Sequence, residues 1–429
     1  MEMWCGVDWA ERQHDVAIVD DTGTLRARAR ITDDAAGFTQ LLELLATHGR
    51  DCGRQIPVAI ETAKGLLVAN LRAAGIPVFA INPLSVSRYR DRHTPSRAKS
   101  DAGDALVLAH ILRTDGAAHR AVPDDTELAQ SIRHLARAHQ DMIWDRMQAA
   151  SKLRSLLREY YPTFLATFDD LASREARATL HLAPSPAKAA TLRRNTVMAA
   201  LRRAGRTRGL EATATKILDG LKEPQLRQPP QVEAAMARQA DALARTLDTM
   251  VANVDDLEAA LTTAYASHPD AEIISSFPGL GTVLGARVLG EIGDDRSRFT
   301  NARGLKAFAG TAPVTRSSGM KTVVTMRVVR NKRLGQAAYL WALPMLAHSP
   351  GARAHYDRRR AAGDSYSAAA RNLTNRGLGM LHHCLHTRQL YDETKAFPRT
   401  PTPATATSSN PSAHQTSQEA EAPPTPAVA

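Results

Sequence analysis

The sequence predicts a mixed α/β domain at its N-terminal end, a long helical region, and then a second, mainly helical domain. Strand-like runs crowd the first quarter, a Gly-free helical stretch opens the middle, and Gly and Pro return after residue 270. The 429 residues give room for two or three domains, each with its own core. We expect four segments, at residues 1–115, 116–265, 266–395 and 396–429.

Short apolar runs near the N-terminus predict the strands of the α/β domain. They lie at residues 3–9, 14–20, 24–31, 57–60 and 78–81, with helical stretches at 35–48 and 66–74. The turn sequence Asp21-Thr22-Gly23 makes the first three runs an antiparallel meander. The later run at 57–60 is continuously apolar, which is typical of a strand buried on both faces. The alternation of strands and helices predicts an α/β domain that ends near residue 115.

The middle of the chain reads as helical throughout. Residues 125–161 have apolar side chains at helical spacing and no Gly, which predicts a long exposed helix able to form a coiled coil. Prolines then interrupt any continuous helix up to residue 265; they are Pro184, Pro186, Pro224, Pro229 and Pro230. The last residues, from Pro398 on, are rich in Pro, Ala, Thr and Ser, and we expect them to be disordered.

The segment from residue 271 to 391 opens with FPGLGTVLGARVLGEIG, whose Gly and Pro spacing is similar to a helix-hairpin-helix. In such a motif a Gly turn exposes backbone N–H groups to a DNA phosphate, which makes Gly279 and Gly281 candidate contacts. A Gly-rich turn between two packed helices explains the same residues equally well.

Composition favours a nucleic-acid partner. The chain has 55 Lys and Arg against 44 Asp and Glu, a formal charge of +11, and such a field attracts phosphate backbones. An Arg-rich soluble protein would show the same excess. The three cysteines have no metal-binding spacing, and no segment has the pattern of a signal peptide or the length of a membrane span. We therefore expect a cytoplasmic protein without a disulfide framework.

Four carboxylates stand where strands and a helix begin or end. Asp8 lies in the first strand, Glu61 follows the run at 57–60, and Asp101 and Asp104 share one face at the start of a helix. Two Mg²⁺ ions about 4 Å apart need such oxygen ligands to hydrolyse a phosphodiester. The aspartate pair could instead cap its helix, and Glu61 could be a surface loop residue. The order and placement of the four favour a metal site.

The same segments carry a family resemblance. GVDWAERQHDVAIVDDTG, AIE and KSDAGDALVLAHILR resemble the DEDD motif of the RuvC-like domain in transposases of insertion-sequence family 110. GLLVANLRAAGIPVFAINP, SFPGLGTVLGARVLGEIGD and FAGTAPVTRSSG also resemble that family, so the likeness spans residues 3 to 392. It implies an RNase H-like (RuvC-like) domain at 1–115, a helical or coiled-coil oligomerisation region at 116–265 and a helical transposase domain at 266–395.

A basic strip between residues 316 and 333 contains no acidic residue. Its cations are Arg316, Lys321, Arg327, Arg330, Lys332 and Arg333. Such a strip would hold a nucleic-acid backbone, although a solvated basic face of a helix and loop has the same composition. Ser317 and Ser318 lie within it on what reads as a flexible turn. By its residues alone Ser318 is an ordinary turn serine, but the resemblance implies that it attacks the DNA phosphodiester, with Ser317 as the alternative.

The resemblance also implies partners. They are the DNA of the element ends and target, a structured guide RNA, and further copies of the chain in a dimer or tetramer. The carboxylates of one subunit would complete a site with the serine of another. The long helix at 125–161 is a plausible dimerisation element by its own pattern.

Three other functions fit parts of the sequence. An actin-like sugar kinase or ATPase would use the first strand-turn-strand to hold phosphates, but no second Gly-rich phosphate loop follows. A junction nuclease would use only the four carboxylates, and Ser318 would then be dispensable. A catalytically silent nucleic-acid-binding scaffold would tolerate the change Asp8→Ala.

Overall fold

The N-terminal strands form one five-stranded sheet in the computed structural model, which describes residues 2–93 and 100–398, without the side chains of residues 51 and 52. The strands are β1 (Met3–Asp8), β2 (Gln13–Asp20), β3 (Leu25–Thr32), β4 (Val58–Ile60) and β5 (Val78–Ala80). Their order is β3-β2-β1-β4-β5; β1, β2 and β3 pair antiparallel, and β4 runs parallel to both β1 and β5. The predicted meander and β-α-β alternation are confirmed.

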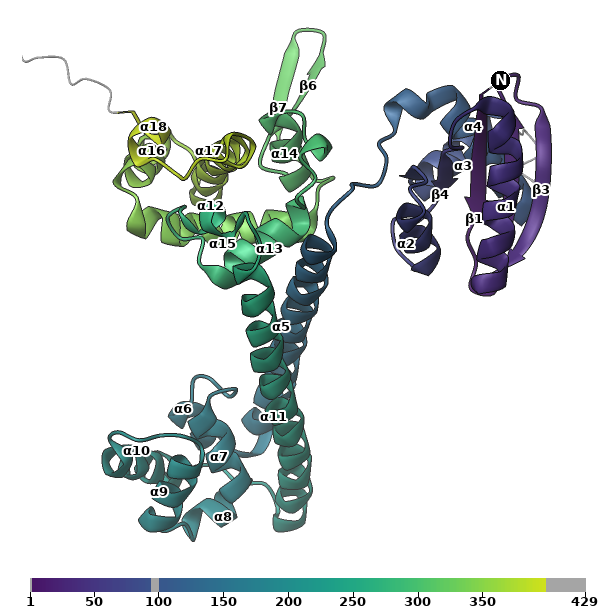
Figure 1. Ribbon diagram of the computed structural model, residues 1–429. Helices are drawn as coiled ribbons and strands as arrows, with labels where there is room; N and C mark the ends of the chain where they lie inside the picture. Colours follow the sequence, from purple (N-terminus) through teal and green to yellow (C-terminus); the bar gives the residue numbers. More distant parts are fainter. Residues whose placement is uncertain (1, 94–99, 399–429) are drawn as a thin grey trace, which may run out of the picture.

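Helices cover both faces of this sheet (Figure 1). They are α1 (Ala35–Cys52), α2 (Leu66–Ala73), α3 (Pro83–His93) and α4 (Asp101–Asp115). Leu41 of α1 and Leu71 of α2 are buried against one face of the sheet, whereas Val86 of α3 and Leu108 of α4 are buried against the other. Because side chains alternate along a strand, residues of even number in β1 face α4.

A long pair of helices, α5 (Glu127–Tyr160) and α11 (Pro230–Ala266), forms an arm. A short 3-10 turn, η1 (Gly116–Ala118), and a linker join the N-terminal domain to it (Figure 1). The long helix predicted at 125–161 is confirmed, but it is not fully exposed. Its apolar stripe packs against α11 of the same chain, so the side chains that predicted a coiled coil already have an internal partner.

A small helical domain, which we call the distal domain, lies at the far end of the arm (Figure 1). It contains α6 (Pro162–Thr167), α7 (Arg174–Leu182), α8 (Pro186–Ala190), α9 (Arg194–Arg203) and α10 (Leu210–Lys222). The prolines act as predicted, because α7 ends before Pro184, α8 begins at Pro186 and α11 begins at Pro230. Its core includes the rings of Tyr160 and Phe164.

The C-terminal domain packs around the other end of the arm. Its elements are α12 (Ala271–Ser275), α13 (Thr282–Ile292), η2 (Arg296–Arg298), α14 (Ala302–Ala309), β6 (Val314–Ser318), β7 (Lys321–Thr325), α15 (Lys332–His348), α16 (Pro350–Ala361), α17 (Tyr366–Thr387) and α18 (Glu393–Ala396). Trp341 lies at the centre of its core, which also includes Ile132 of α5 and Leu261 of α11. This end of the arm therefore belongs to the core of the C-terminal domain, so a boundary at 265/266 falls between two helices that share one core. The domain is mainly helical, as predicted, except for the hairpin of β6 and β7.

Within the described residues, no helix is both long and apolar enough to cross a membrane. Cys5 and Cys384 are buried free thiols. The side chain of Cys52 and most of the predicted disordered tail, residues 399–429, lie outside the described residues.

Candidate active site and nucleic-acid interface

Two of the predicted carboxylates follow neighbouring strands. β1 and β4 run parallel, and their last paired residues are Val7 and Ile60. Asp8 and Glu61 come directly after these residues, so both lie at the carboxyl ends of β1 and β4 and on the face of the sheet that α4 covers. Both are partly exposed.

Helix α4 brings the other two carboxylates to the same end. A Cβ added at Gly6 would lie 2.0 Å from a backbone oxygen of α4, so this helix touches β1 directly. Its last turn lies at the opposite end of the sheet, where Arg113 donates to the backbone oxygen of Asp21 at 3.2 Å. The helix therefore runs antiparallel to β1, and its first turn, with Asp101 and Asp104, lies at the carboxyl end of β1. We call Asp8, Glu61, Asp101 and Asp104 the acidic corner.

Neither aspartate of α4 is the cap of the helix. The cap is Ser100, whose hydroxyl oxygen accepts the N–H of Gly103 at 3.2 Å, so the pair does not cap the helix, although both aspartates lie in its first turn and favour its positive end. Asp101 is exposed, whereas Asp104 is only 5% exposed and forms an ion pair with Arg90 of α3. The Nε atom of Arg90 is buried and has no hydrogen-bond partner within residues 2–93 and 100–398.

A fifth carboxylate, Asp15, was missed by the sequence analysis. It lies directly opposite Asp8 across the antiparallel pair of β1 and β2, is 7% exposed, and forms an ion pair with Arg30 at 3.0 Å. The hydrogen bond from Arg30 to Asp15 raises the pKa of this arginine, and the charge of Asp101 adds to the effect. Arg30 thus lies beside the acidic corner. The sequence did contain a signal for Asp15, because Asp8 and Asp15 flank the short turn of the first hairpin in the meander and therefore face each other.

The donor chemistry of the acidic corner fits a hard divalent cation, because every donor is a carboxylate oxygen. Arginine guanidinium groups lie against Asp104 and Asp15, which shows that the negative charge there attracts cations. Across the described residues, however, no three His, Cys, Asp or Glu side chains stand close enough together to hold a metal ion. The carboxylates gather at one corner without forming a closed ligand set, and Asp104 would have to exchange Arg90 for a metal ion.

An exposed aromatic ring lies beside the acidic corner. Trp9 directly follows Asp8 and is 47% exposed. Its ring stacks on buried His14 with centroids 6.4 Å apart, and His14 is fixed by the N–H of Ala10 at 3.3 Å and by Asp33 at 3.1 Å. Such a ring offers a surface on which a nucleobase can stack.

Ser318 lies at the end of an exposed β-hairpin. It is the last residue of β6 and pairs with Lys321 of β7, so the serine is on a strand and not on the flexible turn that the sequence predicted. The turn has Gly319 at a φ of 56°, which glycine adopts readily. Ser318 is exposed, and the hydroxyl of Ser317 is 3.2 Å from that of Thr322. Ser318 is thus presented to solvent at the end of β6, in a hairpin that projects from the C-terminal domain (Figure 1).

A buried carboxylate anchors the base of this hairpin. Glu291 of α13 is 5% exposed and accepts two hydrogen bonds from Arg137 of α5, at 2.7 and 2.8 Å. It also accepts the side-chain N–H of Asn331 at 2.7 Å, and Asn331 caps α15. Burial opposes the charge of Glu291, but the hydrogen bonds and charge of its partners outweigh burial and lower its pKa.

The basic strip divides into free and engaged cations. Arg316 and Lys321 are exposed on the hairpin and form no ion pair with any described carboxylate. Arg330 packs over Gly310, and Arg327 is partly buried. Arg333 is engaged within the chain, because it donates to both carboxylate oxygens of Asp141 at 2.8 and 2.9 Å. The chain has no acidic residue from 296 to 356, so the segment around the hairpin is uniformly cationic.

The predicted Gly-rich turn connects α12 and α13. Gly279 has a φ of 83°, and a Cβ there would lie 2.8 Å from Pro344 of α15. The neighbouring carbonyl of Pro278 accepts the indole N–H of Trp341 at 2.9 Å. Gly281 is exposed, and a Cβ there would meet no atom within 4 Å. Tight helix packing therefore explains Gly279, whereas Gly281 leaves its backbone open to a ligand.

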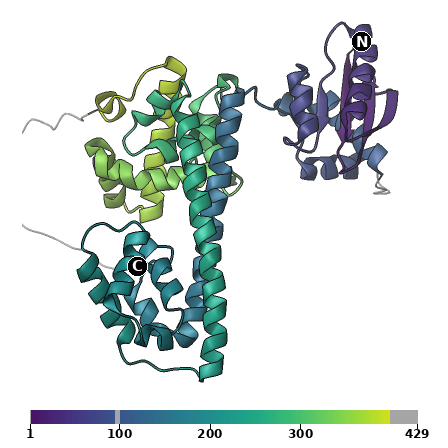
Figure 2. The ribbon, with the colours of Figure 1, turned by 60° about the horizontal axis from the view of Figure 1, so that its bottom comes forward.

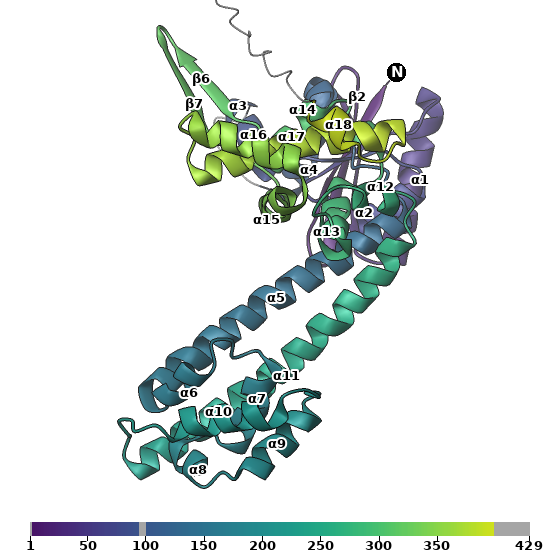
Figure 3. The same cartoon turned by 90° about the vertical axis from the view of Figure 1, so that its left-hand side faces the viewer.

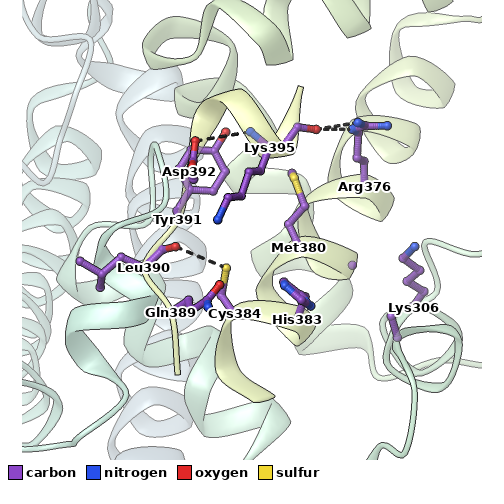
Figure 4. Close-up of a pocket in the computed structure, with 13 residues that line it drawn as sticks. Lys306, Arg376, Met380, His383, Cys384, Gln389, Leu390, Tyr391, Asp392 and Lys395 are labelled. Carbon is purple, nitrogen blue, oxygen red and sulfur yellow. Dashed lines mark hydrogen bonds between the residues drawn. The ribbon is translucent and has the colours of Figure 1, made fainter. Parts of the chain in front are cut away.

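A cavity of about 450 Å³ lies between α14, α17 and α18 (Figure 4). Arg376 is engaged there with the backbone oxygen of Ala396 at 2.6 Å. Lys306 and Lys395 also line it, and neither forms an ion pair with a described carboxylate. These two lysines add to the positive charge of the C-terminal domain.

Comparisons with known proteins show the family to which the chain belongs. A family model for DEDD transposases of the IS110 type matches residues 5–162, and one for the IS116/IS110/IS902 transposase family matches residues 271–357. The chain is 57% identical over 401 residues to the transposase assigned to the mini-circle IS117 of Streptomyces coelicolor, covering 92% of this chain and 97% of that protein.

More distant relatives cover the same length. An uncharacterised 42 kDa protein of IS900 from Mycobacterium paratuberculosis is 29% identical, over 91% of this chain and 97% of its own length. An uncharacterised 44.8 kDa protein of IS116 from Streptomyces clavuligerus is also 29% identical, over 91% and 96%. These matches exclude the sugar-kinase interpretation. The chain belongs to the IS110/IS116/IS902 family of transposases, and so to the enzymes of DNA recombination.

Proposed function

We propose that the chain cuts and rejoins the DNA strands of an insertion sequence, with the acidic corner and Ser318 as the two halves of its active site. The observation that carries this proposal is the gathering of carboxylates from three separate segments at one end of the sheet. The exposed hairpin serine, in a segment free of acidic residues, supplies the complementary half. Arg316, Lys321, Arg327 and Arg330, the backbone at Gly281 and the ring of Trp9 would hold the DNA.

We also propose that the N-terminal domain, residues 1–115, is RNase H-like of the RuvC type. The strand order β3-β2-β1-β4-β5 supports this, because a meander is extended by two parallel strands through helical crossovers. The regions 116–265 and 266–395 would then be the helical oligomerisation region and the transposase domain.

Asp8, Glu61, Asp101 and Asp104 would hold Mg²⁺, since hard cations prefer carboxylate oxygens. When bound, the metal would polarise the phosphodiester and neutralise charge on the leaving oxygen. The protein fixes its own part of the site through backbone structure: β1 and β4 hold Asp8 and Glu61, and contact with Gly6 holds α4. Arg90 would hold the Asp104 carboxylate in place until a metal ion replaces the arginine.

In the proposed reaction the Oγ atom of Ser318 attacks phosphorus and loses its proton. A P–O bond to a deoxyribose oxygen breaks, and that oxygen leaves as a hydroxyl group. The new phosphoserine bond retains the energy of the phosphodiester, so a hydroxyl of another strand can displace the serine and rejoin DNA. Cations at Arg316 and Lys321 would stabilise the charge that develops on the phosphate.

The proposed assembly contains several copies of the chain and a structured guide RNA. The hairpin projects upward from the C-terminal domain in Figures 1 and 3, and Figure 1 shows it separate from the sheet of the N-terminal domain. A second copy could therefore supply the serine to the acidic corner. On α5, Trp144 and Met147 remain 37% and 60% exposed after α11 has packed, which leaves apolar surface for a dimer contact. The guide RNA would supply sequence specificity to a protein that holds phosphate backbones.

Covalent capture tests this function. The full chain is incubated with labelled element-end DNA, Mg²⁺ and the RNA encoded by its element, and products are separated under denaturing conditions. A protein–DNA adduct should form, disappear in Ser318→Ala and Asp8→Asn, and persist in the neighbouring control Ser317→Ala. Free nicked ends without an adduct, unchanged in Ser318→Ala, would instead show a simple metal-dependent nuclease.

A further inference from the structure

The distal domain has a basic surface that neither family match covers. The matched regions end at residue 162 and resume at 271, whereas the distal helices lie between them. The chain contains no Asp or Glu from residue 176 to 210. This stretch has eight cations, which are Arg177, Lys188, Arg193, Arg194, Arg202, Arg203, Arg206 and Arg208. The positive charge of residues 176–210 therefore lies in a different part of the sequence from that of the segment around the hairpin, residues 296–356.

Helix α9 turns this charge outward. Val197, Ala200 and Leu201 are its buried residues. The exposed side chains of the helix are Arg194, Asn195, Thr196, Ala199, Arg202 and Arg203. Every polar group among them can donate a hydrogen bond and none is acidic, and Ala199 is small enough to let a backbone approach. Arg, Asn and Thr are side chains that contact DNA phosphates without reading sequence.

A groove of about 540 Å³ continues this surface between α7 and α9. One carboxylate, Asp248 of α11, lines it, and that carboxylate is engaged with Arg177 and with Nε2 of His181 at 2.6 Å. Arg174 and Arg203 also line the groove, are exposed, and form no ion pair with the described carboxylates. The charge left for a ligand is therefore positive.

Figures 1 and 2 agree that the distal and C-terminal domains project to the same side of the arm. The 34 residues of α5 span about 51 Å at 1.5 Å per residue. A DNA duplex rises about 3.4 Å per base pair, so about 15 base pairs match the length of α5. The hairpin lies beyond the upper end of α5 in Figure 1, so a duplex held there needs more than about 15 base pairs to reach α9.

We propose that α9 and the α7–α9 groove bind the phosphate backbone of duplex DNA, more than about 15 base pairs from the strand exchanged at the hairpin. The distal domain then acts as a second anchor that holds flanking DNA along the arm. This inference rests on the family's action on DNA and is independent of Ser318 as nucleophile.

The proposal is tested by measuring how the full chain binds two element-end duplexes. The long duplex extends 25 base pairs beyond the crossover, and the short duplex extends 6 base pairs beyond it. The variant Arg174→Ala, Arg202→Ala, Arg203→Ala removes three exposed cations. The control Lys152→Ala, Lys216→Ala, Arg238→Ala removes three exposed cations elsewhere on the arm and distal domain. Fluorescence anisotropy at several salt concentrations gives affinity and salt slope without requiring cleavage.

The test variant should bind the long duplex about 10- to 100-fold more weakly, with a salt slope smaller by about 2.7 because each phosphate contact contributes about 0.9. Its affinity for the short duplex and its melting temperature should match those of wild type. Unchanged binding of the long duplex, an equal loss on both duplexes, or an equal loss in the control variant would overturn the proposal. So would a loss confined to a structured RNA probe, since the surface would then serve RNA.

Discussion

The substitution Gly6→Ala tests how the sheet assembles the acidic corner. The new Cβ would lie 2.0 Å from the backbone oxygen of Ala105 and 2.5 Å from the backbone nitrogen of Ala109. Real Cβ contacts begin near 3.0 Å, so α4 would have to withdraw by about 1 Å from β1. Overpacking of this kind costs about 1–3 kcal/mol. For a domain of this size that corresponds to a fall of about 4–12 °C in its melting temperature.

Differential scanning calorimetry and Mg²⁺-dependent DNA cleavage measure the two consequences. Gly49→Ala, within α1, is the matched control, because its Cβ would lie 3.5 Å from the nearest atom, the backbone oxygen of Arg54. This variant should unfold with the same free energy as wild type or with a free energy higher by about 0.5–1 kcal/mol. At temperatures where it is still folded, the Gly6→Ala protein should cleave DNA more slowly than wild type, because Asp101 and Asp104 move with α4. A Gly6→Ala protein that melts within 1 °C of wild type and cleaves at full rate would refute the packing argument.

Three further predictions concern the C-terminal domain. Glu291→Gln weakens the hold on Arg137 and should lower the unfolding free energy by about 1.5–3 kcal/mol in urea melts, whereas exposed Glu272→Gln should have no effect. The pKa of Glu291 is lowered in the folded state. The ionised carboxylate therefore stabilises the fold above its unfolded pKa of about 4.3, and this stabilisation is lost as the pH falls through the lower folded pKa. Urea melts from pH 7 to 3 should show the unfolding free energy falling only below about pH 4. Gly279→Ala should lower the melting temperature by several degrees, because of its φ of 83° and its contact with Pro344, while Gly281→Ala should melt as wild type does. Equal melting of the two glycine variants would contradict the packing assigned to Gly279.

The sequence predicted local structure well where one physical pattern dominated. The meander, the helices of the α/β domain and the long helix at 125–161 follow from periodicity and turn residues, and the structure confirms them. The partner of that long helix could not be predicted, because the same apolar stripe fits a second copy or a distant helix of the same chain. The structure pairs it with α11, which begins at Pro230, 70 residues after α5 ends at Tyr160.

The sequence suggested candidate residues for the site but not their contacts. Asp8, Glu61, Asp101 and Asp104 were marked by their positions at element ends, and the sheet register places these ends together. The hold of Arg90 on Asp104 depends on how α3 packs against α4, which no local pattern encodes. The strand position of Ser318 was missed because its hairpin lacks an apolar face and is exposed on both sides.

Binding of Mn²⁺ in crystals of the full chain tests the central claim most directly, because anomalous scattering locates the ion without reference to activity. The account predicts Mn²⁺ bound by carboxylate oxygens of Asp8, Glu61, Asp101 and Asp104, with Arg90 displaced, and loss of that peak in Asp8→Asn. Manganese bound elsewhere, or absent from the acidic corner at saturating concentration with DNA present, would contradict it.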